Sequence, residues 1–408
     1  MKKTIKIFAL GLLSAALFSC QDAALPTIDN LVYISDAANG RLGMVSMADA
    51  GEDTQVSFTV RLAQKANEDT KVKIAIDTTI LEAYNSTYQS SFKHVAAENI
   101  EAPYYVTIPA GNVASDPVTI AVKSFDTMGA QYAISFKIES KGNIPVAEQS
   151  SQYIVQLMKP LKQLVPTFTN ACAMECEPIG QAWGLELMNY TLEWWVKMSA
   201  LNINNQAIIN SGTMSASEGG NPVGCELYIR FGDLIYSSGG RYDNRFLQIK
   251  TMGSQFDTGN PTQSGNELNA GQWYHFAIAY DGNIGKSIMY KDGQMVAELS
   301  TGAGRTMNID RFQMCSSGTQ YFPNSAEMCQ VRLWKTTRTA AQIQKNMRSE
   351  VEYSNPDLIM YIPMNEGPGA SVLKDVTGNG HDCYIGALTA AGGNGRGTQA
   401  RGWTEYAF

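Results

Sequence analysis

The sequence predicts an all-β fold in two domains, and three observations support this prediction. Short segments in which polar and apolar residues alternate recur along the chain and are typical of half-buried strands. The length of 408 residues exceeds the usual size of a single domain. All six tryptophans and six of the seven cysteines lie between Cys172 and Trp403, so the two halves of the chain differ in composition.

The composition excludes two classes of protein. Charged residues make up 17% of the chain and hydrophobic residues 44%, which argues against a disordered acidic protein. With 31 Lys and Arg against 38 Asp and Glu, the chain lacks the basic excess that nucleic-acid binding requires. We therefore expect a folded protein with no nucleic-acid partner.

Residues 1–19 have the features of a bacterial signal peptide. Three lysines precede an apolar run over residues 7–18, which is shorter than the roughly 20 residues of a membrane-spanning helix. Residues 17–20 read Leu-Phe-Ser-Cys and resemble a lipobox, which implies cleavage before Cys20 and acylation of that cysteine. The alternative is an ordinary signal peptide that is cleaved at another position.

Residues 20–27 then form the lipidated cysteine and a short tether that contains one acid, Asp22. An acid in such a tether resembles the surface-export signal of Bacteroidota lipoproteins. The resemblance implies a protein that is anchored to the outer membrane by lipid and faces the cell exterior.

The first domain is predicted over residues 28–160. A turn that contains Pro109 and Gly111 joins two of its strands, because these residues supply the restricted and the permissive backbone angles that turns need. A short helical patch lies between Thr78 and Tyr88. Six short strands at this spacing are typical of a β-sandwich. The strands are predicted at residues 55–62, 71–76, 105–108, 118–122, 132–138 and 152–158.

The segments LEAYN, Tyr88, VTIPAGN and VTIAV follow one another in an order that resembles a domain of unknown function at the N-termini of Bacteroidota surface lipoproteins. The resemblance implies an immunoglobulin-like β-sandwich. His94 is isolated, and a single histidine does not make a metal site. We therefore interpret the first domain as a spacer that holds the second domain away from the membrane.

Residues 161–166 are predicted to be a linker, because prolines bracket them, and residues 167–408 form the second domain. Asp292-Gly293 separates two alternating runs and indicates a tight hairpin. Residues 339–347 are predicted to be helical, with Ile343 and Met347 on one face. Further strands are predicted at residues 191–198, 273–280, 287–291, 330–334 and 358–363.

The segments of this second domain resemble the laminin-G or concanavalin A-like jelly roll, a fold of lectins and glucanases. The matching segments are TLEWWVKM, WYHFAIAYDG, MYKDGQMV, VRLWKTTRTAAQIQKNM and LIMYIPMNEGPG with DVTGNGHD, in that order. The resemblance implies two curved antiparallel sheets packed face to face, with a concave surface and rim loops.

The acids of the second domain do not form the pair that glycoside hydrolysis needs. Retaining glycosidases place two carboxylates about 5 Å apart, and the run Glu-x-Asp-x-x-Glu of the concanavalin-like hydrolases is absent. Glu175 and Glu177 lie outside any predicted strand, and Glu193 is alone on its strand. His275 lies mid-strand, with no nucleophile elbow nearby. We therefore expect no enzymatic activity, with a divergent glycoside hydrolase as an alternative.

Carbohydrate sites combine an aromatic ring, which stacks on the C–H face of a sugar, with planar polar groups that bond to hydroxyls. One glycine-rich loop offers both kinds of group, and it is the main candidate for a ligand site. Its candidate residues are Arg241, Tyr242, Asp243, Asn244 and Arg245. The alternative for this segment is a solvated hairpin loop.

Two further aromatic residues are candidates for ligand binding. Trp183 lies among glycines outside any alternating run, and Phe322 belongs to a loop of aromatic and amide residues. Trp194, Trp273 and Trp334 lie on predicted strands and are expected in the core.

No loop has the spacing of a calcium site, so the sequence predicts no cofactor, although calcium stays open as an alternative for a fold that often binds it. The six cysteines that follow Cys20 permit disulfides in an oxidising compartment. The alternative is a set of buried free thiols.

Taken together, these features predict a surface lipoprotein that captures oligosaccharide or polysaccharide without catalysis, for use by neighbouring glycan-import proteins. Two alternatives remain: an adhesive or structural lipoprotein that binds protein through the same jelly roll, and a divergent glycosidase.

Overall fold

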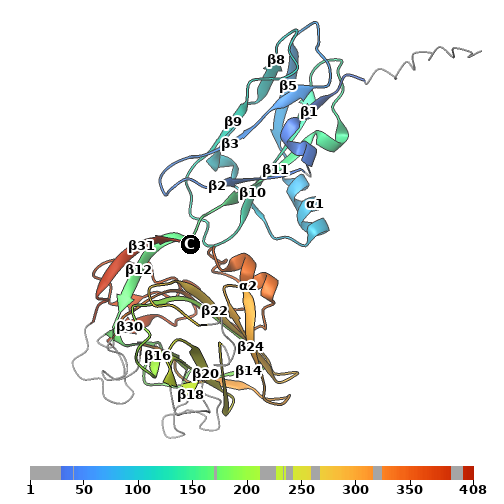
Figure 1. Cartoon of the computed structure of the whole chain (residues 1–408). Coiled ribbons are helices and arrows are strands. Elements are labelled where there is room, and N and C mark those ends of the chain that lie inside the picture. Colours follow the sequence, from blue (N-terminus) through green and yellow to red (C-terminus); the bar gives the residue numbers. More distant parts are fainter. Residues whose placement is uncertain are drawn as a thin grey trace, which may run out of the picture.

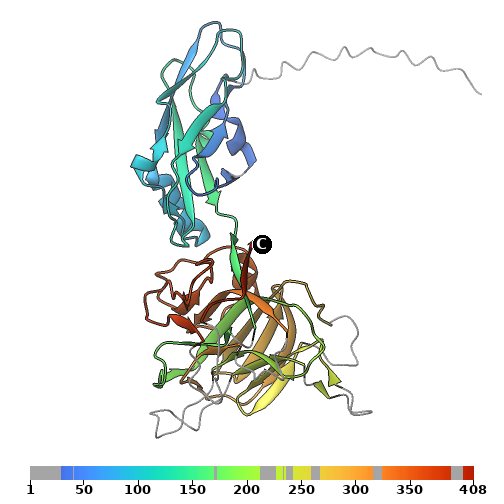
Figure 2. The ribbon, with the colours of Figure 1, turned by 90° about the vertical axis from the view of Figure 1, so that its left-hand side faces the viewer.

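The computed structural model describes residues 29–39, 41–169, 172–211, 227–232, 234–235, 242–258, 267–315, 324–386 and 398–408. The chain forms two β-sandwich units, with the N-terminal unit above the C-terminal unit in Figure 1. Figure 2 shows the single crossing of the chain between them. The predicted all-β fold is confirmed. In the described part of the chain, neither α-helix is long and apolar enough to cross a membrane.

The N-terminal unit consists of eleven strands, one α-helix and three 3₁₀ helices. The strands are β1 (Val32–Ile34), β2 (Leu42–Ser46), β3 (Thr54–Phe58), β4 (Val60–Leu62), β5 (Thr70–Ile76), β6 (Lys93–His94), β7 (Ile100–Glu101), β8 (Tyr105–Ile108), β9 (Val118–Val122), β10 (Tyr132–Ser140) and β11 (Gln152–Met158). The helices are α1 (Thr78–Tyr88), η1 (Ser35–Asn39), η2 (Ala97–Asn99) and η3 (Glu148–Ser150).

Two sheets enclose the core of this unit. One has the order β2-β11-β10-β5-β8 with β6 beside β10, the other has the order β3-β9-β7, and β1 pairs separately with β4. Phe58 of β3 and Phe136 of β10 meet between the sheets, with ring centroids 5.4 Å apart. The alternating pattern of the sequence therefore places its apolar residues in one continuous core.

One predicted strand of this unit is wrong as a single element. Residues 55–62 divide into β3 and β4, which pair in different sheets. The break falls at Thr59, whose N–H donates to the Asp36 carboxylate and whose carbonyl accepts from Ser35 N, both at 3.0 Å. The alternation continues through this corner, so the pattern alone does not reveal the change of sheet. The other five predicted strands are confirmed, with ends within two residues.

The C-terminal unit contains the remaining strands and one helix. They are β12 (Lys162–Phe168), β13 (Met174–Cys176), β14 (Leu185–Leu187), β15 (Asn189–Met198), β16 (Gln206–Asn210), β17 (Tyr228–Phe231), β18 (Leu234–Ile235), β19 (Tyr242–Asp243), β20 (Leu247–Thr251), β21 (Ser254–Asp257), β22 (Tyr274–Asp281), β23 (Lys286–Lys291), β24 (Gln294–Ser300), β25 (Met307–Ile309), β26 (Gln313–Met314), β27 (Ala326–Trp334), α2 (Ala340–Asn346), β28 (Leu358–Ile362), β29 (Val372–Leu373), β30 (Cys383–Ile385) and β31 (Gly402–Ala407).

Two eight-stranded sheets form the sandwich of the C-terminal unit. The large sheet has the order β24-β23-β22-β15-β27-β12-β31, with β28 beside β27. The second sheet has the order β21-β20-β17-β16-β26-β13-β30-β29. The inward side chains of both sheets, including Trp194 and Phe276, form one buried core. The predicted hairpin at Asp292-Gly293 joins β23 to β24, and the predicted helix forms with Thr339 as its N-cap in a capping box.

The segment that we predicted to be a linker is a strand. Residues 162–166 are the first part of β12, which pairs with β31 over residues 162–167 and with β27 at residues 167 and 168. Gln163 and Val165 are buried while Lys162 and Leu164 are exposed, which is the alternation of a strand with one buried face. Pro166 is tolerated in this strand. The connection between the two units is therefore shorter than predicted and covers only residues 159–161.

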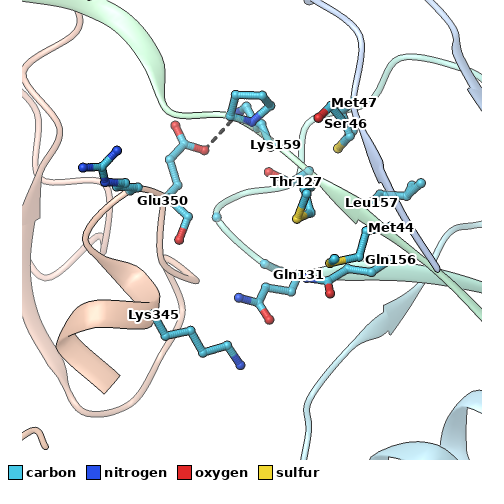
Figure 3. A pocket seen from close by; sticks show the side chains of 16 residues that line it. Met44, Ser46, Met47, Thr127, Gln131, Gln156, Leu157, Lys159, Lys345 and Glu350 are labelled. Carbon is cyan, nitrogen blue, oxygen red and sulfur yellow. Dashed lines mark hydrogen bonds and ion pairs between the residues drawn. The ribbon is translucent and has the colours of Figure 1, made fainter. Parts of the chain in front are cut away.

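The two units contact each other through the segment that follows α2. Glu352 accepts from Lys93 at 2.6 Å and Glu350 from Lys159 at 3.0 Å, while Tyr353 N donates to Met128 O at 3.1 Å. Beside these contacts lies a cavity of about 440 Å³, shown in Figure 3. Its lining comes from both units: Met44, Met47, Gln131, Leu157 and Met158 from the first, and Lys345 and Glu350 from the second.

We predict that Gly129→Ala separates the two units. Gly129 has a positive φ of 71°, and a methyl group at its Cα would overlap the backbone carbonyl of Val351 in the other unit. We expect a larger radius of gyration in small-angle X-ray scattering and faster proteolysis at residues 159–161. The matched control is Gly111→Ala, which has a similar φ of 76° and open space around the added methyl group. Identical scattering curves for the two variants would show that the units are held together by other contacts.

Candidate functional site

A cavity of about 400 Å³ opens at one end of the second sheet of the C-terminal unit. Two connections border it: residues 177–184, which join β13 to β14, and the turn that precedes β30. Its lining residues are Glu177, Pro178, Ile179, Gln181 and Gly380. The cavity thus presents a carboxylate and an amide next to the predicted site residue Trp183.

Trp183 is half-buried beside this cavity. Its N–H donates to Asp310 O at 2.9 Å, which fixes the backbone. The indole stacks on the imidazole of His381, with centroids 4.0 Å apart and an interplanar angle of 18°, and lies 6.1 Å from the ring of Phe312. One face of the indole is therefore occupied by His381.

The turn that carries His381 is held by carboxylates. Asp375 accepts from the N–H groups of Thr377 and His381, at 3.1 and 3.2 Å. The His381 Nδ1 atom lies 2.9 Å from Glu177 O, so the two borders of the cavity contact each other. A hydrogen bond to the Glu177 carboxylate raises the pKa of Tyr384. The Glu177 carboxylate therefore contacts β30 as well as the cavity that it lines.

The outer face of the second sheet carries planar polar groups that sequence reasoning missed. Arg230 donates to Gln248 Oε1 from Nε and Nη2, at 3.0 and 2.6 Å, and from Nη1 to Asn205 Oδ1 at 2.8 Å. Gln313 Nε2 donates to Glu175 at 2.9 Å. The period-two patterns of β17 and β20, Tyr-Ile-Arg-Phe and Leu-Gln-Ile-Lys, are the signal from which this polar face could have been predicted.

The predicted loop lies at the opposite end of this sheet from Trp183. At one end of β16, Gln206 pairs with Phe231 of β17. The residue that follows Phe231, Gly232, donates its N–H to Phe246 O at 3.0 Å, so this end of the sheet lies close to Asn244. Asn210, at the other end of β16, is opposite Gln313 of β26, next to the Phe312 ring that Trp183 contacts. A strand rises about 3.3 Å per residue, so the two ends lie roughly 13 Å apart.

Of the predicted ligand residues whose side chains are described, the structure therefore does not bring Trp183 together with Asn244 and Arg245. Asn244 is half-buried, with its side chain against Gly232, and Arg245 is exposed. The backbones of Tyr242 and Asp243 form β19, which pairs with β18. Arg241 and Phe322, like the predicted lipidation residue Cys20, lie outside the described residues.

Glu193 and His275 lie beneath helix α2, away from solvent. Both side chains are at most 1% exposed, and Glu193 forms a salt bridge of 3.0 Å with Arg338 and lies 3.6 Å from His275. Burial raises the pKa of Glu193 against the opposing effect of Arg338, and burial followed by the nearby arginines lowers the pKa of His275. This cluster joins the large sheet to the segment after β27, which is a structural role.

The remaining acids and cysteines are also largely buried. Glu175 is fully buried on β13, a strand that the sequence analysis did not predict. Five cysteines in the described residues are buried free thiols, and burial raises the pKa of Cys315 and Cys329. In the same residues, no three or more His, Cys, Asp or Glu side chains gather where they would hold a metal ion. Trp194 and Trp334 are buried as predicted, and Trp273 is partly buried against the core.

Comparison with known proteins agrees with this architecture. Residues 182–344 match the family model of the concanavalin A-like lectin/glucanases superfamily, of laminin-G type. The C-terminal unit is a concanavalin A-like domain. A second family model, which describes an N-terminal domain, matches residues 28–145. No curated protein matches the chain.

Solved structures resemble the chain to different extents. A proposed carbohydrate-binding protein from Bacteroides ovatus aligns with a TM-score of 0.61 and 18% identity, over 92% of this chain and 97% of that one. The ligand-binding domain of botulinum neurotoxin serotype D, in complex with N-acetylneuraminic acid, aligns over 46% of this chain and 45% of that one (TM-score 0.31, 10% identity). A heptameric pentraxin from Limulus polyphemus aligns over 45% and 80% (TM-score 0.29, 14% identity). The alignment with the Bacteroides ovatus protein shows that the folds of the two units occur together in another chain.

We predict that Arg338→Ala destabilises the concanavalin A-like domain. The substitution leaves the Glu193 carboxylate buried without its ion pair, which lowers the free energy of unfolding by about 3–5 kcal/mol. Urea unfolding followed by tryptophan fluorescence reports on this domain, because all six tryptophans follow residue 182.

The control for this prediction is Arg401→Ala at an exposed arginine, which should change the stability by less than about 0.5 kcal/mol. Adding Glu193→Gln to Arg338→Ala removes the stranded charge and should restore part of the loss. Equal stability of the two arginine variants would rule out a structural role for the ion pair.

Proposed function

We propose that this protein is a lipid-anchored glycan-binding protein of the bacterial cell surface, which captures oligosaccharide or polysaccharide for neighbouring import proteins and does not hydrolyse it. In this proposal the concanavalin A-like domain holds the sugar, and acylated Cys20 holds the chain in the outer membrane. The N-terminal unit fixes the position of the lectin-type domain relative to that anchor.

The observation that carries the proposal is the cavity beside Trp183. Its lining supplies the carboxylate of Glu177 and the exposed amide of Gln181. The stacked pair of Trp183 and His381 adjoins this lining, because His381 follows Gly380 and contacts Glu177 O at 2.9 Å. These are the groups that bind a sugar ring and its hydroxyls. The volume of about 400 Å³ lies within the range of small-molecule sites.

Two further findings support binding without hydrolysis. The Bacteroides ovatus protein that shares the fold over nearly its whole length is itself a proposed carbohydrate-binding protein. Among the acids considered as catalytic candidates, Glu175 and Glu193 are fully buried, and Glu177 alone lines the cavity. A retaining hydrolase would need a second carboxylate about 5 Å from the first.

We predict that Gln181→Ala, Glu177→Gln and Trp183→Ala each weaken glycan binding. Loss of one hydrogen bond of about 1 kcal/mol corresponds to an increase in Kd of roughly 5-fold. Native affinity electrophoresis in gels that contain plant or host polysaccharides measures the effect, and reducing-sugar release is assayed in parallel. Because Trp183 is packed against His381, the exposed Gln181 provides the variant that leaves the fold intact.

The matched control for Gln181→Ala is Gln294→Ala, an exposed glutamine on β24. Unchanged retardation in all three site variants would refute the site. Absence of retardation by every polysaccharide would refute glycan binding, and reducing-sugar release that depends on Glu177 would show hydrolysis.

We predict that Cys20→Ala abolishes lipidation. The thiol of Cys20 is the acceptor that the lipobox resemblance implies, so the variant should incorporate no labelled palmitate and should leave the membrane fraction. Cys225→Ala, the same substitution elsewhere, should keep the label. If Cys20→Ala is still labelled and membrane-bound, the segment is not a lipoprotein signal.

A further inference from the structure

The aromatic rings that face solvent lie on the N-terminal unit. Among the described residues, three tyrosines are the aromatic side chains with more than about a third of their surface exposed: Tyr88 at 66%, Tyr104 at 59% and Tyr105 at 38%. The described part of the concanavalin A-like domain contains all six tryptophans, and each of them is buried or half-buried. An exposed aromatic ring has a hydration cost that ligand binding removes, so these positions are candidates for contact with a ligand.

Tyr88 borders a groove between α1 and the sheet. The groove has a volume of about 520 Å³, and its floor includes Ile154 of β11. Tyr84 and Tyr88 are four residues apart and therefore lie on the same face of α1, with ring centroids 4.5 Å apart. Figure 1 shows α1 on the outer side of the N-terminal unit.

Polar groups complete the lining of this groove. Arg41 and Gln152 supply a guanidinium and an amide. Thr79 and Thr87 of α1 supply hydroxyl oxygens that act as acceptors, because each hydroxyl already donates within the helix region, at 2.6 and 2.8 Å. Arg41 is held in place, because Nε donates to Gln149 O at 2.9 Å and Nη1 to Gln152 Oε1 at 3.3 Å. The Gln152 amide oxygen is thereby engaged, which leaves its NH₂ group as a donor for a ligand.

The helix that carries the tyrosines has a fixed position. Asp77 caps its N-terminus by accepting from Thr79 N at 3.1 Å, and Lys137 forms an ion pair of 2.9 Å with the same carboxylate. Ile80 and Leu81 pack against the sheet. The rings of Tyr84 and Tyr88 are therefore presented from a rigid element, which lowers the entropic cost of binding.

The chemistry of the lining selects the class of ligand. Stacked aromatic rings favour the apolar face of a pyranose, while threonine hydroxyls, an amide and a guanidinium favour its hydroxyl groups. No acid lines the groove, and one arginine is its only charge, so a ligand needs no charge of its own. We propose that the groove beside α1 is a second carbohydrate site, which binds a neutral pyranose oligosaccharide with Tyr84 and Tyr88 stacked against a sugar ring.

This site is independent of the cavity beside Trp183, because the two lie on different units of the chain. Two sites on one chain bind a polysaccharide more tightly than either site alone, provided that both can be engaged at once. The N-terminal unit then contributes to glycan capture directly and is more than a spacer.

The test uses the full chain and four neutral polysaccharides: amylopectin, laminarin, galactomannan and mannan. Affinity electrophoresis identifies the polysaccharide that retards the protein most, and isothermal titration with an oligosaccharide prepared from it measures stoichiometry. The variant Tyr88→Ala removes a ring that is two-thirds exposed and should leave folding intact. The control is Tyr104→Ala, a tyrosine of similar exposure outside the groove.

We expect Tyr88→Ala to lower retardation at least threefold and to remove one binding event per chain, while Tyr104→Ala behaves as the unchanged protein. If the cavity beside Trp183 binds as well, the unchanged chain shows two events, and Gln181→Ala and Tyr88→Ala each remove one. If that cavity does not bind sugar, the unchanged chain shows one event, which Tyr88→Ala removes and Gln181→Ala does not.

Two results would overturn the proposal. Equal binding by Tyr88→Ala and Tyr104→Ala would show that any glycan is bound elsewhere and leave the groove to a different kind of partner. Failure of all four polysaccharides to retard the unchanged protein would show that the groove does not bind neutral glycans of these classes.

Discussion

The relative position of the two units depends on a guanidinium group that is buried against the large sheet. Arg332 of β27 is 1% exposed and donates to Asn346 O at 2.9 Å and to Ser349 O at 2.6 Å. Trp195 of the neighbouring strand donates from Nε1 to Met347 O at 2.7 Å. These donors hold the chain after α2 against the sheet, and the same chain then offers Glu350 and Glu352 to the N-terminal unit. A buried charge is stable here because backbone carbonyls surround it.

This arrangement divides the surfaces of the concanavalin A-like domain between two tasks. The outer face of the large sheet is covered by α2 and the segment that follows, so Glu193, His275 and Arg338 stabilise the fold there. The second sheet carries polar groups on its outer face and the Trp183 cavity at one end of its strands. Glu193 and His275, which the sequence offered as catalytic candidates, are therefore used for packing, while Glu177 lines a cavity that is built from loops, as is common for binding sites.

Local sequence patterns allowed much of the fold to be predicted. They did not reveal the contacts between residues that are distant in the sequence. Period-two alternation identified β5, because alternate residues of this strand face the core. It failed at Thr59, where the chain changes sheet without a change of pattern, and at β12, where Pro160 and Pro166 suggested a linker. Trp183 was chosen as a candidate from its glycine-rich setting, but its stacking on His381 joins residues that are distant in sequence. No spacing rule reveals such a contact.

The distribution of aromatic residues shows why composition alone is a weak guide to a binding site. The tryptophans are concentrated in the second half of the sequence, which suggested that the ligand-contacting rings would be found there. In the structure, Trp194 is buried in the interior of the sandwich, and Trp334 is buried in a separate cluster with Leu358 and Tyr361, so the large area of both rings stabilises the fold. Among the residues that the structure describes, the ring most exposed to solvent belongs instead to Tyr88, in the unit with no tryptophan. Exposure in the folded state, which sequence counts do not contain, therefore decides which aromatic residues are available to a glycan.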